Sequence, residues 1–149
     1  MEHVQALPAA DLAAALPKLR RFARVLVGGR DGADDLVLAT LGDARRATRG
    51  PPPGADLRTW LFGLMHAAHR HGPHPHSNEG QPSEAAATDI CARLLRLPVE
   101  EREVLMLVAV ERLSYADIAK LLDAPVASVM SALARGRARL GAMESASAG

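Results

Sequence analysis

A chain of 149 residues is long enough for one medium domain or two small ones, and a hydrophobic content of 48% excludes a fully disordered protein. Aromatic residues make up only 3%, which favours helices packed through aliphatic side chains over a β-sandwich, so we predict an all-α fold of two small helical domains. A net charge of +1 permits nucleic-acid binding but supplies little non-specific attraction, so strong DNA affinity is expected to need a partner.

Three amphipathic helices are predicted in the first domain, residues 1–71. They are bounded by polar residues at their starts and by glycine or proline after their ends: Asp11 to Gly28-Gly29, Asp31 to Arg49, and Asp56 to Gly72-Pro73. In the third helix, Trp60 and Phe62 follow the helical period, which favours a place in the core over a role in stacking on bases.

Residues 72–87 are rich in proline, glycine and histidine and predict a flexible linker. Just before it, His66 and His69 share one helix face at a spacing compatible with joint metal coordination. Together with His71, His74 and His76 they form a histidine cluster, and no acid or cysteine lies inside it. A polar linker is therefore the favoured interpretation. His66 and His69 remain weak metal candidates, and no cofactor is predicted. The single cysteine, Cys91, excludes an internal disulfide and is expected to be a buried structural thiol.

The second domain is predicted at residues 88–140, followed by a flexible tail at 141–149. Thr88 or Asp89 caps a first helix through Leu97, and Pro98 opens the next one. The run from Val104 to Val110 in that helix is apolar on every side, so it is expected to be central to the domain or covered by a partner.

Leu113 to Leu140 is typical of a helix-turn-helix. Ser114 is placed to cap a helix starting near Tyr115, and Asp123-Ala124-Pro125 interrupts that helix before a second one. We expect the second helix to turn its apolar positions to the core, namely Val126, Val129, Leu133 and Leu140. Its other face is expected to meet DNA with Ser128, Met130, Ser131, Ala134 and Arg135.

The second helix also carries Arg135, Arg137 and Arg139, with no acid between Asp123 and Glu144. Three arginine-phosphate contacts would contribute a salt slope of roughly −3. The alternative is an amphipathic helical hairpin whose arginines are only solvated.

The order of these parts resembles an extracytoplasmic-function (ECF) sigma factor over roughly residues 11–140. The positions similar to sigma region 4 are Leu97-Pro98, Glu101 to Leu105, Leu113 to Tyr115, Ile118-Ala119, Pro125-Val126, Val129, Ser131, Leu133, Arg135 and Arg137. Those similar to region 2 are Phe22 to Arg24, Ala33 to Val37, Thr40-Leu41 and Leu57 to Phe62. The resemblance implies core RNA polymerase and promoter DNA as partners, with control by an anti-sigma factor. It places Asp34, Asp35 and Leu36 near the polymerase clamp, and Ser128, Met130, Ser131 and Arg135 near upstream bases and phosphates.

The chain also departs from the family pattern. Leu38 and Ala39 replace polar residues that would meet the clamp, and Met130 and Ala132 stand where basic residues are common. Val108 and Ala109 replace polar residues expected on an exposed face, which favours a protein contact there. Leu38 and Val108 are therefore predicted to contact polymerase or an anti-sigma factor.

These departures keep a second interpretation open. It is a sigma mimic, resembling the sigma-like part of general-stress response regulators, which binds an anti-sigma factor without initiating transcription. Ala39-Thr40-Leu41 and Leu61 to His66 favour it. No catalytic motif is found, so no enzyme is expected. The chain shows neither a secretion signal nor an apolar run of membrane-spanning length, so we expect a cytoplasmic protein without membrane insertion.

Overall fold

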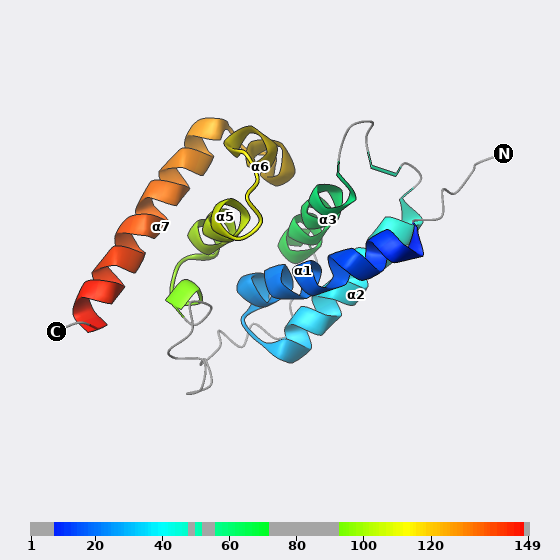
Figure 1. The fold of residues 1–149 in the computed structure, drawn as a ribbon, viewed down its shortest axis with the longest axis horizontal. Coiled ribbons are helices and arrows are strands. Elements are labelled where there is room, and N and C mark those ends of the chain that lie inside the picture. The colour runs from blue at the N-terminus through cyan, green and yellow to red at the C-terminus, as the bar shows by residue number, and fades with distance from the viewer. Residues whose placement is uncertain (1–7, 48–49, 52–55, 72–92, 148–149) are drawn as a thin grey trace. The chain divides into compact units, whose positions relative to one another are not determined.

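The computed structural model describes residues 8–47, 50–51, 56–71 and 93–147, and every regular element in these ranges is helical (Figure 1). The chain divides into two compact units, Met1–Ser77 and Asn78–Gly149. This confirms the all-α fold with two small helical domains. The boundary between the units falls inside the predicted linker, 72–87, which itself lies outside the described residues, as does Cys91.

The first unit is a bundle of α1 (Ala9–Val27), α2 (Arg30–Arg46) and α3 (Leu57–His71), each of which contacts the other two (Figure 1). Gly28 ends α1 in the left-handed conformation, with φ at 91°, and its N–H donates to the Arg24 carbonyl. Glycine adopts this conformation without the steric cost that a Cβ imposes. The chain therefore reverses within two residues, and α2 packs along α1.

Three predicted helix ends in this unit are wrong. Helix α1 begins at Ala9, because the extended residue Pro8 precedes it and its carbonyl accepts the Leu12 N–H; Asp11 is a first-turn acid rather than the cap. Helix α2 begins at Arg30 and ends at Arg46, where the Ala47 N–H donates to the Asp43 carbonyl. Local sequence leaves such ends uncertain by a few residues.

The core of the first unit is built around two phenylalanines. The rings of Phe22 on α1 and Phe62 on α3 lie 5.0 Å apart between centroids and are tilted by 55°, and both side chains are fully buried. Tilted aromatic pairs at this separation contribute beyond their buried area. This confirms the core position predicted for Phe62, whereas Trp60 is only partly buried.

The second unit contains α5 (Val99–Ala109), α6 (Tyr115–Leu122) and α7 (Val126–Ser147). Pro98 precedes α5, as predicted, and α7 contacts both α5 and α6 (Figure 1). Its core is aliphatic, and the largest fully buried side chains are Met106, Leu107, Ile118 and Val129. The apolar run in α5 is buried from Val104 to Leu107 and exposed at Ala109 and Val110.

Helix α7 is longer than predicted. The expected flexible tail at 141–149 is wrong for residues 141–147, which continue the helix to Ser147. No proline interrupts this segment and alanine favours the helix, while Glu144 reaches Arg93 at the start of the described part of the unit, with 3.5 Å between Oε1 and Nη1. The pair links the end of α7 to the residues before α5.

Candidate functional site

The turn between α6 and α7 has the geometry predicted for a helix-turn-helix. The Ser114 hydroxyl accepts the Asp117 N–H at 3.0 Å and so caps α6. Asp123 ends that helix in the left-handed conformation, with φ at 52°, and the Ala124 N–H donates to the Ala119 carbonyl at 2.9 Å. Aspartate tolerates this conformation better than most residues. Pro125 then leads directly into α7.

The outer face of α7 presents the residues predicted to meet DNA. Those exposed are Ser128, Met130, Ser131, Ala134 and Arg135, together with Arg137 and Arg139. Val129 and Leu133 are buried against the rest of the unit, as predicted, and Leu140 is partly buried. The amphipathic division of the helix is therefore confirmed over most of its length.

Two assignments to the faces of α7 are wrong. Val126 is 42% exposed rather than buried, because it lies in the first turn at the edge of the face defined by Val129 and Leu133. Ala132 is 5% exposed and lies in the core, so it is no substitute for a base-contacting residue. Met130 is 52% exposed and does lie on the outer face.

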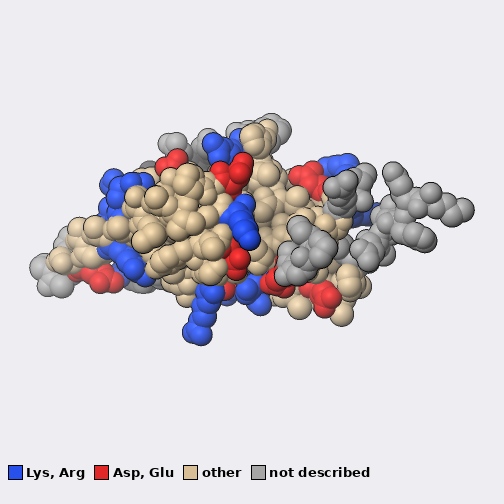
Figure 2. Space-filling view, turned by 90° about the horizontal axis from the view of Figure 1, so that it is seen from above, with Lys and Arg blue, Asp and Glu red and all other residues tan. Residues whose placement is uncertain are grey.

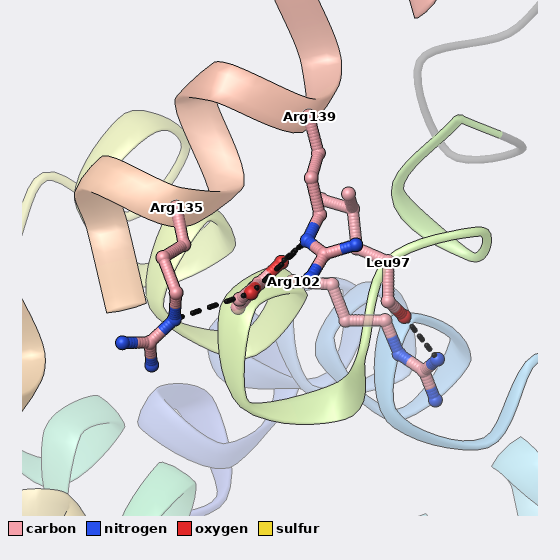
Figure 3. A network of polar contacts seen from close by, with 5 residues as sticks. Leu97, Arg102, Arg135 and Arg139 are labelled. Atoms are coloured by element: carbon pink, nitrogen blue, oxygen red, sulfur yellow. Dashed lines mark hydrogen bonds and ion pairs between the residues drawn. The ribbon is translucent and has the colours of Figure 1, made fainter. Parts of the chain in front are cut away.

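Two arginines of α7 meet one buried carboxylate on α5 (Figure 3). The Arg135 Nε lies 3.4 Å from Glu101 Oε1, and the Arg139 Nε lies 3.0 Å from Oε2 and donates to Oε1 at 3.3 Å. The Glu101 side chain is 4% exposed, whereas the two arginine side chains are more than half exposed. Arginine reaches the carboxylate without leaving the surface, which supplies the pairing that a buried charge requires. Sequence analysis did not find this network.

Gly136, between the two arginines, lets α7 approach α5 closely. A Cβ at this position would lie 2.7 Å from Leu105 Cδ1 and 3.4 Å from Glu101 Cβ. The distance to Leu105 Cδ1 is too short for two carbon atoms, so a larger residue fits only if Leu105, which is itself buried, moves. The glycine thus sets the helix separation at which both arginines reach Glu101.

A third arginine, Arg102, holds the turn before α5. Its Nη1 donates to the Leu97 carbonyl at 3.2 Å (Figure 3). Burial lowers the pKa of this guanidinium below its ordinary value, and the neighbouring Glu103 carboxylate partly raises it again. Arg102 therefore serves the fold of the unit, and its side chain is less exposed than those of the α7 arginines.

The basic side chains form no broad patch on the face shown in Figure 2. Lys and Arg appear there in small separate groups, with acidic side chains and wide uncharged areas between them. On this face no concentration of positive charge stands out that would attract a polyanion from a distance.

The residues predicted to meet a protein partner differ in exposure. On α2, Asp34 and Asp35 are exposed and Leu38 is 67% exposed, whereas Leu36 is only 7% exposed. Leu36 faces the interior because it shares the inner face of α2 with Ala33 and Thr40, so it offers a partner little surface and its contact with polymerase or an anti-sigma factor stays a prediction. Val108 on α5 is partly buried.

The histidines do not form a metal centre among the described residues. His66 is partly buried on α3 and His69 lies one turn further on, but the described ranges contain no group of three or more histidine, cysteine or acidic side chains that could hold a metal ion. His74 and His76 of the predicted linker lie outside those ranges. None of the described helices is both long and apolar enough to cross a membrane.

Comparisons with known proteins divide the chain in the same way. Residues 12–66 match the family model described as the sigma2 domain of PhyR, and residues 89–140 match sigma-70 region 4. An ECF RNA polymerase sigma factor, EcfG of Rhodopseudomonas palustris (strain TIE-1), is 33% identical and aligns with 89% of this chain and 82% of its own.

Solved structures show the same fold. The sigma factor RpoE of Bartonella quintana, in complex with the anti-sigma factor NepR, has a TM-score of 0.71 and 26% identity over 88% of this chain and 92% of its own. CnrH in complex with the cytosolic domain of CnrY has a TM-score of 0.70 and 26% identity over 91% and 85%. The stress response regulator PhyR has a TM-score of 0.63 and 25% identity over 90% of this chain but only 50% of its own.

Proposed function

The chain belongs to the family of ECF RNA polymerase sigma factors, and from this premise we propose that it directs core RNA polymerase to promoters and initiates transcription there. Sigma factors of this family bind core RNA polymerase and promoter DNA. The observation that carries the proposal is the exposed face of α7 behind the α6–α7 turn, where Ser128, Ser131 and Arg135 point outward. A helix presented in this way fits the major groove.

In this proposal each unit has its own role. Helix α7 contacts the upstream promoter element, with Ser128, Met130 and Ser131 at base edges and the arginines at phosphates. Helix α2 contacts the polymerase through Asp34, Asp35 and the exposed Leu38. The chain acts in the cytoplasm by binding, without catalysis of its own. Because its surface charge is weak, the polymerase supplies much of the affinity for DNA.

We also propose that an anti-sigma factor controls the chain. Two proteins of similar fold were solved as complexes: RpoE with the anti-sigma factor NepR, and CnrH with the cytosolic domain of CnrY. Exposed apolar side chains on both units, Leu38 at 67% and Val110 at 42%, are available to a partner. Covering apolar area stabilises a complex by about 25 cal/mol per Å² before the costs of association.

One observation favours a second candidate, a sigma mimic. The first unit matches the sigma2 domain of PhyR, and a PhyR complexed with NepR is described as an anti-anti-sigma factor. In this alternative the chain binds an anti-sigma factor but not core polymerase. The net charge of +1 and the exposed, apolar Leu38 suit both candidates, so the two must be separated by activity.

The deciding experiment is run-off transcription by bacterial core RNA polymerase on a pool of promoter fragments, with and without the chain. We expect specific transcripts that depend on the chain. They should fall at least tenfold with Ser131→Glu, because a carboxylate on the outer face of α7 repels phosphates. The matched control is Ala14→Glu, which puts the same charge on an exposed position of α1.

Specific transcripts that resist Ser131→Glu would contradict the role given to α7. No specific transcript, together with binding of the chain to a NepR-type anti-sigma factor, would instead support the mimic.

A further inference from the structure

Both arginines that meet Glu101 use the same atom to do so. The contacts of Arg135 and Arg139 with the carboxylate run from Nε, at 3.4 and 3.0 Å. The side chains remain 57% and 55% exposed, while Glu101 is 4% exposed. In Figure 3 the terminal nitrogens of Arg135 point away from the carboxylate. The Arg135 guanidinium is thus held from its inner edge and open at its outer edge, and Arg139, also held through Nε, keeps more than half of its side chain exposed.

This arrangement suits arginine and no other cation. A guanidinium carries five N–H donors in a rigid planar fork, and Nε supplies only one of them. The two terminal nitrogens keep four donors for a second anion, in the geometry that binds a phosphate bidentately. A lysine has a single ammonium on a flexible stem, which cannot be held at one edge by a buried carboxylate while a phosphate takes the other.

We propose that Glu101 is a positioning residue for DNA binding: it fixes Arg135 and Arg139 through Nε so that their terminal nitrogens are already aimed when a backbone phosphate arrives. The inference rests on the proposed function, because it assumes that α7 binds promoter DNA. The two arginines are four residues apart on α7 and lie on one side of the helix. Their shared anchor is rigid, since it belongs to a buried position of α5 packed against Gly136.

Glu101 also changes how the two cations act at a distance. Its charge offsets part of theirs, so DNA of any sequence attracts them less, while the aimed donors favour a correctly docked duplex. The carboxylate therefore raises discrimination between a promoter and other DNA. Arg20 is exposed on α1, which is not part of the proposed DNA-binding face, so it serves as the reference for an arginine-to-lysine exchange.

The test exchanges each arginine for lysine in the full chain assembled with core RNA polymerase. The probe is a duplex selected from a randomised pool by the wild-type assembly, and a scrambled duplex of equal length measures non-specific binding. We expect Arg135→Lys and Arg139→Lys each to weaken binding to the selected duplex by about tenfold, since a charged hydrogen-bond pair is lost. The control Arg20→Lys makes the same exchange at an exposed position of α1 that has no role in the proposed DNA contact, and should change it less than about twofold.

Glu101→Gln separates positioning from folding. We expect the affinity ratio of selected to scrambled duplex to fall about tenfold, with binding to the scrambled duplex unchanged or tighter because a negative charge has gone. A purely structural role would lower both affinities together and leave the ratio unchanged. That result, or lysine variants at 135 and 139 that bind like Arg20→Lys, overturns the inference while the proposed function stands. A wild-type assembly with no preference for any duplex overturns both.

Discussion

At the scale of single residues, the contact between α5 and α7 depends on the missing side chain of Gly136. We predict that Gly136→Ala destabilises the second unit by about 1–3 kcal/mol, because the new Cβ would lie 2.7 Å from a buried Leu105 methyl and 3.2 Å from Leu105 Cγ. Alanine's better helix propensity, worth about 1 kcal/mol, opposes this only in part. The measurement is the free energy of unfolding in urea.

Gly141 provides a matched control on the same helix. No heavy atom lies within 4 Å of the Cβ that Gly141→Ala would add, so this variant should stabilise the unit by about 0.5–1 kcal/mol through helix propensity alone. Opposite signs for the two variants are the expected result. A Gly136→Ala protein that gains stability like Gly141→Ala would show that the helices do not approach closely at this point.

At the scale of helices, α6 is short and depends on its cap. We predict that Ser114→Ala costs about 1 kcal/mol, because the Asp117 N–H loses the hydroxyl that accepts it at 3.0 Å. Thermal unfolding of the full chain gives the measurement. Ser131→Ala is the comparison: this serine lies exposed inside α7, where alanine is the better helix former, so the substitution should be neutral or slightly stabilising. Equal losses from both variants would contradict the capping role.

The helix-turn-helix shows what sequence can and cannot supply. Ser114 and the Asp123–Pro125 turn were predictable because a cap and a turn are decided by neighbours in sequence. The pairing of Glu101 with Arg135 and Arg139 was not, because it joins residues 34 and 38 positions apart and exists only when α5 packs on α7. The sequence predicted three arginines at DNA phosphates. The structure shows that two of them, Arg135 and Arg139, also contact a buried carboxylate.

Predictions about helix faces differ from the structure for two reasons. The family resemblance placed Leu36 near the polymerase clamp and Ala132 where basic residues are common, yet both side chains are buried. The helical period placed Val126 in the core, but Val126 lies at the edge of the apolar face and is exposed. The packing of the neighbouring helices decides the burial of such positions.

At the scale of the whole molecule, each unit has a core of its own kind. The first is organised by the Phe22–Phe62 pair, and the second is aliphatic, with Ile118 and Val129 among its fully buried side chains. The only tryptophan, Trp60, belongs to the first unit, so its fluorescence reports the unfolding of that unit. Hydrogen exchange of the α6 and α7 amides reports the second. The two transitions can therefore be followed separately in the intact chain.

We predict that the units unfold independently. Phe62→Leu removes the ring contact and leaves a small cavity, a loss of about 1–2 kcal/mol, which should lower the midpoint of the Trp60 transition by about 5–10 °C and leave exchange in α7 unchanged. Ile118→Val is the reciprocal variant: a loss of about 1 kcal/mol should speed exchange in α6 and α7 without moving the Trp60 transition. If either substitution shifts both readouts, the chain unfolds as one cooperative body. Separate stabilities would let a partner that binds one unit change the stability of that unit while the other stays folded.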